Sequence, residues 1–176
     1  MTTRQQQTDE QLMVLIQAHN HEAFSELVTR HCDRFYALAY RTLFNQSDAE
    51  DMVQEAFLKL WQKPTLWRHK HGSKFTTWFY RLVVNACYDL NKKKSSQEFS
   101  LSDQKYDAAI EDDESATQLS ELEAALRELP ERQRTALNLC FYEGLSNQDA
   151  ANIMDFNLKA LQSFIMRAKE NENARQ

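Results

Sequence analysis

The sequence of 176 residues has very little of the two residues that make tight turns, with only two glycines and two prolines. An all-β sandwich or barrel needs many such turns, so this scarcity disfavours both classes and favours helices joined by short polar connections. The three cysteines, Cys32, Cys87 and Cys140, are isolated and odd in number. They argue against a disulfide framework and predict a protein of the reducing cytoplasm.

Long apolar runs and enzyme motifs are also missing. No run of about 18 apolar residues is present, so we expect no membrane span, and the polar first ten residues lack the apolar core of a signal peptide. The sequence contains no CxxC pair, no Gly-rich phosphate loop and no nucleophile elbow. We therefore predict no enzymatic activity, no metal and no cofactor.

The net charge of −5 is unusual for a nucleic-acid-binding protein, but the charge is unevenly distributed. Residues 98–128 hold ten acids and two bases, a net −8, whereas residues 1–97 hold thirteen bases and ten acids, a net +3. Residues 63–94 alone hold eight bases and one acid. A basic segment thus precedes a strongly acidic one, although a mixed, solubilising surface would give the same pattern.

Hydrophobic spacing divides the chain into three zones. Residues 11–94 are rich in apolar and aromatic residues at helical spacing, and residues 118–172 show the same spacing again. Residues 95–117 contain Ser, Gln, Asp and Glu with few apolar positions and no sustained period. We therefore predict an all-α protein with two small helical domains joined by an acidic, flexible linker.

Local motifs predict where several helices begin and end. Capping-box patterns that start at Ser47 and at Ser146 precede two amphipathic helices, and Gly144 suits a left-handed helix end. A three-residue turn at 155–157 then separates the second of these helices from a last helix at about 158–170. Helix, short turn and helix in this order predict a helix-turn-helix in the second domain.

Two helix faces opposite the predicted core stripes carry distinctive residues. On the helix at 49–61, steps of three and four place two acids, an amide and a leucine side by side: Asp51, Gln54, Glu55 and Leu58. Such a strip could dock on a basic partner or simply be solvated. The outward stripe of the helix that begins at Phe75 suits a nucleic-acid strand, because cations neutralise phosphates and rings stack on bases; it comprises Lys74, Thr77, Arg81, Asn85, Tyr88 and Lys92.

These segments resemble bacterial RNA polymerase sigma factors. The run D-A-E-D-M-V-Q-E-A-F-L-K-L-W at 48–61 and the run F-T-T-W-F-Y-R-L-V-V-N at 75–85 are similar to sigma region 2. The runs L-P-E-R-Q-R at 129–134 and Y-E-G-L-S at 142–146 resemble the start of region 4. Two helical modules with an acidic linker are similar to the extracytoplasmic-function group, which implies region 2 at 11–94, a linker at 95–117 and region 4 at 118–172.

The resemblance implies a factor that binds core RNA polymerase and directs promoter recognition, DNA melting and transcription initiation. The strip Asp51, Gln54, Glu55 and Leu58 would dock on the coiled-coil clamp of the largest polymerase subunit. The minus-ten promoter element would meet Lys74, Thr77, Trp78, Tyr80, Arg81 and Asn85. A flipped base would enter the loop at 66–73.

The resemblance also assigns the rest of the chain. The linker would thread the RNA channel, and the last helix would enter the major groove of the minus-thirty-five element. Candidates for that contact are Ser146, Gln148, Lys159, Gln162, Ser163, Arg167 and Lys169, although Leu161, Phe164 and Ile165 make this helix rather apolar. Factors of this group are usually held by an anti-sigma factor, soluble or membrane-bound, and the resemblance implies no small-molecule substrate.

Two other functions remain open at this point. A helix-turn-helix regulator that binds duplex DNA as a dimer would explain the second domain, but neither the acidic strip nor the aromatic and basic helix. A helical metalloenzyme could use the pairs His19/His21 and His69/His71 with the cysteines, but no helix face presents a ligand cluster such as H-E-x-x-H.

Overall fold

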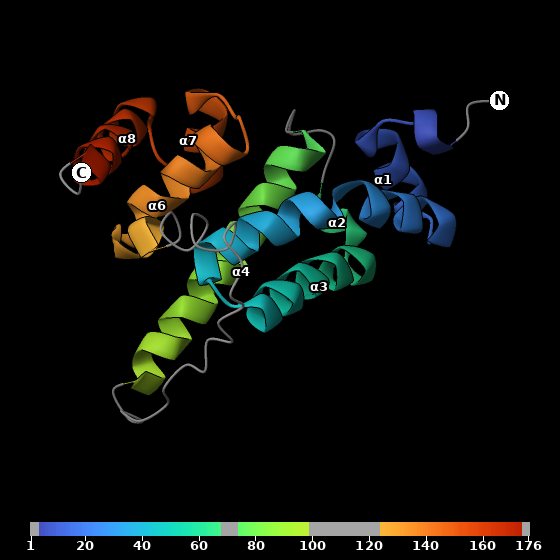
Figure 1. Ribbon diagram of the computed structural model, residues 1–176. Coiled ribbons are helices and arrows are strands. Elements are labelled where there is room, and N and C mark those ends of the chain that lie inside the picture. The colour runs from blue at the N-terminus through green and yellow to red at the C-terminus, as the bar shows by residue number, and fades with distance from the viewer. Residues whose placement is uncertain (1–3, 68–73, 99–123, 174–176) are drawn as a thin grey trace, which may run out of the picture.

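The computed structural model describes residues 4–67, 74–98 and 124–173, and within these ranges all regular structure is helical (Figure 1). The first domain comprises η1 (Arg4–Gln6), α1 (Asp9–Gln17), α2 (His21–Leu43), α3 (Gln46–Gln62), η2 (Pro64–Leu66) and α4 (Phe75–Glu98). The second comprises helical residues 124–128, α6 (Glu131–Leu137), η4 (Asn138–Tyr142), α7 (Asn147–Met154) and α8 (Leu158–Asn173). The predicted all-α fold of two helical domains is confirmed.

The core of the first domain lies between α2, α3 and α4, which contact one another. Its centre is aromatic: the ring of Phe79 lies edge-on to Phe35 at 4.6 Å between centroids and 4.7 Å from Phe57. All three rings are buried. Close aromatic contacts of this kind add to the free energy gained by burying the rings, so α4 is held rigidly against its two neighbours.

The capping box predicted at Ser47 is wrong. α3 begins at Gln46, and the side chain of Asn45 accepts a hydrogen bond from the backbone N–H of Asp48 at 3.0 Å. The cause lies one residue earlier, where Phe44 ends α2 in the left-handed conformation with φ 55°. That turn leaves Asn45 extended, as an N-cap residue must be, and places Ser47 inside the first turn.

The helix-turn-helix of the second domain follows the predicted pattern. Gly144 has φ 67°, and Ser146 accepts a hydrogen bond from the N–H of Asp149 at 3.1 Å to begin α7. Asp155 ends α7 in the left-handed conformation, and the side chain of Asn157 caps α8 by accepting from the N–H of Ala160 at 2.7 Å. Local side-chain caps therefore position α8 relative to α7.

The two domains are packed against each other (Figure 1). α4 contacts α7, α2 contacts α6, and one continuous apolar core contains residues of both domains. α4 runs to Glu98, four residues into the segment predicted as linker; the rest of that linker, and residues 68–73 of the predicted base-binding loop, lie outside the described residues. Among the described helices, none combines the length and hydropathy that crossing a bilayer requires.

Candidate nucleic-acid and partner interfaces

The acidic strip on α3 is exposed along its whole length. Val53, Phe57 and Leu60 turn toward the core, and the opposite face presents Asp51, Gln54, Glu55 and Leu58 to solvent. The leucine is 52% exposed although it is apolar. Large exposed apolar side chains beside charges are a feature of protein-binding surfaces. This arrangement suits a partner surface that combines basic side chains with an apolar contact.

The ridge on α4 is anchored at its N-terminal end. The backbone N–H of Phe75 donates to the carboxylate of Glu10 at 3.1 Å, so α1 closes the start of this helix. Phe75 is fully buried, and its ring stacks on Phe79 at 5.4 Å. The side chains on the other faces of α4 are therefore held at set positions.

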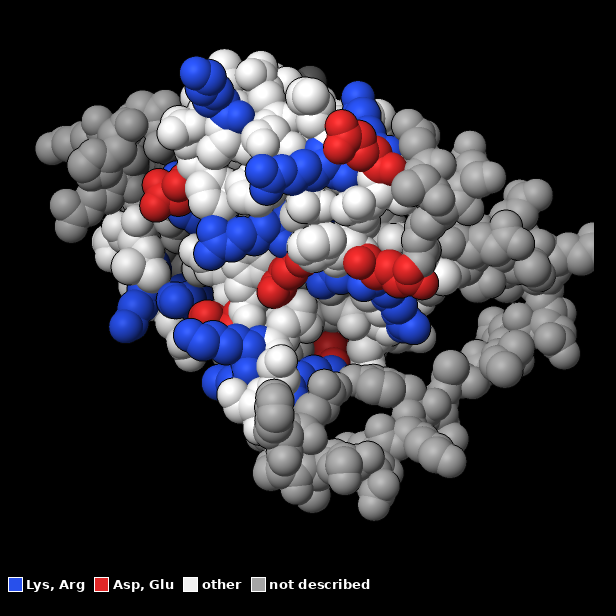
Figure 2. Space-filling model, turned by 90° about the vertical axis from the view of Figure 1, so that its left-hand side faces the viewer, with Lys and Arg blue, Asp and Glu red and all other residues white. Residues whose placement is uncertain are grey.

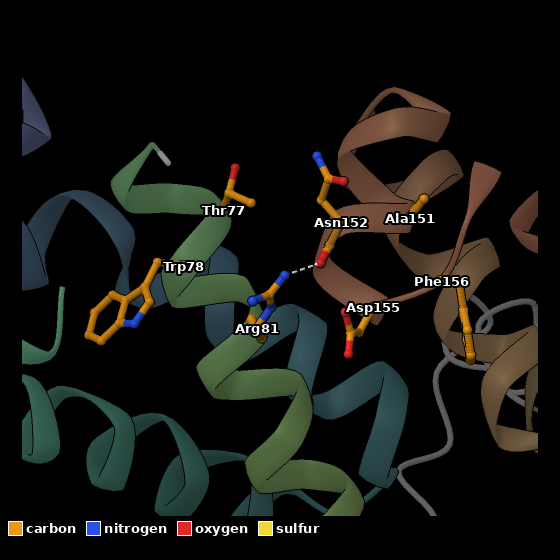
Figure 3. A pocket seen from close by; sticks show the side chains of 7 residues that line it. All are labelled: Thr77, Trp78, Arg81, Ala151, Asn152, Asp155 and Phe156. Carbon is orange, nitrogen blue, oxygen red and sulfur yellow. Dashed lines mark hydrogen bonds between the residues drawn. The ribbon is translucent and has the colours of Figure 1, made fainter. Parts of the chain in front are cut away.

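The structure divides the predicted ridge residues into two groups. Lys74 and Asn85 are exposed, as an interface with DNA requires. The other four differ: Thr77 and Trp78 line a pocket between α4 and α7, Tyr80 is buried, and the exposed Arg81 guanidinium donates to the backbone carbonyl of Asn152. The Trp78 ring itself points away from α7 (Figure 3).

Tyr80 is the most deeply buried of these side chains, with 1% of its surface exposed. Its hydroxyl donates to Glu143 at 2.8 Å. Burial raises the pKa of Tyr80, and the negative charge of Glu143 raises it further. The hydroxyl is thus neutral and committed to an intramolecular acceptor in this arrangement, where the ring has no face free for a nucleotide base.

The outward stripe of α4 is shorter than predicted. Lys92 is exposed, but Tyr88 is half-buried and packs against the shared core. Burial also raises the pKa of the Tyr88 hydroxyl. Tyr88 therefore does not belong to the exposed ridge, because the second domain covers this part of the helix.

The pocket between α4 and α7 has a volume of about 220 Å³. Its walls combine aromatic rings with opposite charges, and Arg81 points across it toward α7 (Figure 3). The lining residues are Thr77, Trp78, Arg81, Ala151, Asn152, Asp155 and Phe156. Sequence reasoning missed Asn152, Asp155 and Phe156 as neighbours of the ridge, because nothing in their local pattern indicates a contact with a helix about seventy residues earlier.

The outer face of α8 combines polar side chains with the apolar Met166, which is 64% exposed. Lys159, Gln162, Ser163, Arg167 and Lys169 are all exposed. At the start of α7, Ser146 and Gln148 are exposed as well, and the Gln148 amide donates to Asn152 at 3.2 Å. Lys169 has a partner within the domain, since its ammonium lies 5.0 Å from the centroid of the Phe141 ring.

Three apolar residues of α8 turn inward, whereas Leu158 and Met166 are exposed. Leu161 is fully buried, Ile165 packs on the shared core, and the Phe164 ring lies 5.2 Å from Phe156. These side chains attach α8 to the rest of the second domain. The opposite face of α8 is left free to enter a DNA groove. Lys and Arg side chains are spread over the side of the molecule where α8 lies, with acids between them (Figure 2). A mixed surface of this kind attracts phosphates only weakly.

Residues that could hold a metal ion do not gather in the described ranges, where no group of three or more His, Cys, Asp or Glu has the required geometry. His19 and His21 instead lie against Trp61, with ring centroids 6.0 and 4.6 Å away. The pair His69/His71 lies outside the described residues. The imidazoles of His19 and His21 are therefore packing groups at the junction of α1, α2 and α3.

Family models match both domains: "Sigma-70 region 2" matches residues 27–97, and "Sigma-70, region 4" matches residues 119–171. The ECF RNA polymerase sigma-E factor of Haemophilus influenzae is 31% identical over 94% of this chain and 94% of its own length. The ECF RNA polymerase sigma factor SigE of Mycolicibacterium smegmatis is also 31% identical over 84% of this chain, which spans only 59% of that longer relative.

Similarity extends to solved structures. The structure of the sigma factor RpoE in complex with the anti-sigma factor NepR from Bartonella quintana superposes with a TM-score of 0.73. The two chains are 24% identical, and the match covers 86% of this chain and 94% of that one. This likeness supports the fold and the pairing of the two helical domains.

Proposed function

This chain belongs to the extracytoplasmic-function sigma factors, and we propose which of its surfaces perform the steps of that function. As a sigma factor it binds core RNA polymerase and directs promoter recognition, DNA melting and transcription initiation, and it is not an enzyme. The metalloenzyme and the polymerase-independent regulator are therefore set aside. The place of action follows from these partners, which are found in the cytoplasm.

The docking surface for core polymerase is the α3 strip Asp51, Gln54, Glu55 and Leu58. One observation carries this proposal: all four side chains are exposed on one face of a helix whose other face is locked into the core. The carboxylates would pair with basic residues of the clamp, and Leu58 would supply the apolar contact that gives such an interface its affinity.

Promoter contacts divide between the domains. The α4 ridge, with Lys74, Thr77, Trp78, Tyr80, Arg81 and Asn85, would meet the minus-ten element. The exposed face of α8, together with the start of α7, would meet the minus-thirty-five element through Ser146, Gln148, Lys159, Gln162, Ser163, Arg167 and Lys169. The exposed polar and basic side chains of α8 support the second contact.

An anti-sigma factor, soluble or membrane-bound, would be a further partner. The family to which the chain belongs supports this proposal, as does the complex of RpoE with NepR, which has a similar fold. The exposed α3 strip is the natural surface for such an inhibitor to cover, because covering it would prevent polymerase from docking.

Charge reversal tests the docking surface. The double variant Asp51→Lys/Glu55→Lys should lose co-purification with core polymerase and should fail in run-off transcription, because it places cations against a basic clamp. Glu50→Lys is the control: it makes one such reversal on the same helix, at an exposed position outside the strip, and it should retain both activities. Equal binding by the double variant and the control would reject the proposed surface.

A further inference from the structure

A buried carboxylate joins the two domains. Glu143 follows η4 in the second domain, yet its side chain is only 5% exposed because it enters the space between α2 and α4. There it accepts hydrogen bonds from the Arg41 guanidinium and from the Tyr80 hydroxyl, both at 2.8 Å. Arg34 lies further away at 3.8 Å. One side chain of region 4 is thus bonded to two helices of region 2.

Polar contacts beside Glu143 extend this junction. Asn138 is fully buried; its carbonyl oxygen accepts from Arg41 Nε at 3.2 Å, and its amide donates to the Arg41 backbone carbonyl at 3.4 Å. Further along α4, the side-chain amide of Asn91 donates to the carboxylate of Glu131 in the second domain at 3.0 Å. Arg41 therefore has both its guanidinium and its carbonyl bonded to the other domain.

Phe44, in the turn between α2 and α3, forms an apolar contact between the domains. It packs on a small cluster of region 4 composed of Leu126, Leu129, Leu137 and Ala168. The Arg127 guanidinium lies 4.9 Å from the centroid of its ring and donates to its backbone carbonyl at 3.1 Å. Exclusion of water from Phe44 and this cluster stabilises the same arrangement.

The contacts between the domains involve the α4 ridge but leave the α3 strip exposed. They engage the α4 ridge, since Tyr80 is bonded to Glu143, Arg81 is bonded to Asn152, and α7 stands beside them. A DNA strand cannot reach Tyr80 while the second domain is in place, because Tyr80 is buried and bonded to Glu143. The α3 strip, by contrast, is exposed in the same arrangement.

We propose that the contacts of Glu143 with Arg41 and Tyr80 form a latch that keeps the free protein closed, and that core polymerase docks on the closed form before the latch opens. The proposal rests on the proposed function of α3 and α4. Docking precedes opening because the α3 strip is exposed in the closed form, whereas on the minus-ten ridge Tyr80 is buried and Arg81 is bonded to α7. The latch thereby couples the release of Tyr80 and Arg81 to the presence of polymerase.

The energetics of the latch favour a two-state switch. Removal of one member of a buried ion pair leaves its partner charged and poorly hydrated, which strongly disfavours the closed form. In the open form the same groups are hydrated, so a variant that lacks one of them loses little there. Polymerase docks on the closed form, but the final complex contains the open form. The overall affinity is therefore lowered by the cost of opening, so latch variants should bind polymerase more tightly.

The test compares two latch variants of the full chain, Glu143→Ala and Arg41→Ala, with wild type and with the control Glu170→Ala on the exposed face of α8. Small-angle X-ray scattering of the free proteins reports the radius of gyration, and circular dichroism verifies that helix content is kept. Surface plasmon resonance with immobilised core polymerase then gives the association and dissociation rate constants of each protein.

Wild type and control should be compact, and both latch variants should be expanded. We expect the variants to bind polymerase roughly 5- to 150-fold more tightly, the span typical of coupled sites, through slower dissociation at an unchanged association rate. A wild type as expanded as the variants, or variants that stay compact, would overturn the latch. Faster association with unchanged dissociation would overturn the order of docking and opening. If none of the four proteins binds core polymerase, the proposed function is rejected. The scattering data would still show whether the free wild-type protein is closed.

Discussion

Asp9 illustrates how a single carboxylate joins two helices of the first domain. At the start of α1, it accepts a hydrogen bond from the His31 ring at 2.9 Å and one from Arg30 at 3.0 Å, both on α2. Burial acts to raise the pKa of Asp9, but the hydrogen bonds and charges of His31 and Arg30 outweigh it, so the net shift is downward. The ionised form therefore stabilises the folded state.

Replacement of this carboxylate should give a pH-dependent loss of stability. Because the pKa of Asp9 is lower in the folded than in the unfolded chain, its contribution is present above the unfolded value and is lost as pH falls through the folded one. Asp9→Asn should lower the free energy of unfolding at pH 7 by about 1.5–3 kcal/mol, as for a hydrogen bond to a charged group. Urea denaturation at pH 7 and at decreasing pH below the ordinary value of 3.8 measures this.

The exposed Asp33→Asn on α2 is the control and should change stability little at either pH. A deficit of Asp9→Asn that stays constant as the solution is acidified would show that packing or helix capping, and not the charge, explains the effect.

Helical spacing accounts for the burial of some single residues but not of others. Phe164 looked out of place in a DNA-reading helix, but it packs against Phe156 on the inner face of α8, as its spacing from the buried Leu161 requires. Tyr80 shows the opposite case. It lies one residue after the core residue Phe79, on a face that helical period leaves open, and only Glu143 and the second domain bury it.

At the scale of elements, the start of α3 matters because this helix carries the docking strip. Asn45 caps it, and the capping side chain satisfies a backbone N–H that would otherwise have no partner within the helix. Misplacement of the first turn would shift the whole exposed strip relative to α2.

The two possible caps of α3 predict different outcomes. Asn45→Ala should lower the free energy of unfolding by about 0.5–2 kcal/mol, the usual cost of losing an N-cap. Ser47→Ala, within the exposed first turn, should have little effect, because alanine is a good helix former. Chemical denaturation of the two variants distinguishes the caps, and a larger loss for Ser47→Ala would restore the capping box that the sequence suggested.

α4 is the element whose sequence is least informative about its surroundings. Its primary stripe, including Phe75, Phe79 and Val83, faces α2 and α3, as the period predicts. A second set, Tyr80, Val84 and Cys87, is buried as well, and α4 contacts α7. Burial raises the pKa of the Cys87 thiol to about 12, so this cysteine is protonated at neutral pH and behaves as an apolar residue. A helix buried on two sides has no single amphipathic face to read.

At the scale of the whole molecule, the negative net charge and the closed arrangement of the domains both weaken binding of the free protein to DNA. The net charge is −5, residues 118–172 of the second domain hold nine acids and six bases, a net −3, and Arg81 of the minus-ten ridge is bonded to α7. A protein of this kind depends on polymerase both for electrostatic attraction to promoter DNA and for the release of Tyr80 and Arg81.

The free chain should therefore bind duplex promoter DNA poorly. In a gel-shift assay at low and at physiological salt, the protein alone should give little complex, and addition of core polymerase should produce a stable, promoter-specific one. Tight and strongly salt-sensitive binding by the protein alone would contradict this expectation, because such binding would require a continuous basic surface that neutralises many phosphates.

The sequence by itself determined the helices, their main buried stripes, the helix-turn-helix and the family, because each depends on residues a few positions apart and on the 3.6-residue period of a helix. The tertiary structure decided that Tyr80 is covered, that Glu143 meets Arg41, and that Arg81 of the α4 ridge is bonded to α7 while the whole α3 strip stays exposed. The contacts of Glu143 join residues 63 and 102 positions apart. Their free energy comes from the burial of charge and apolar surface between domains, which leaves no periodic pattern along the chain.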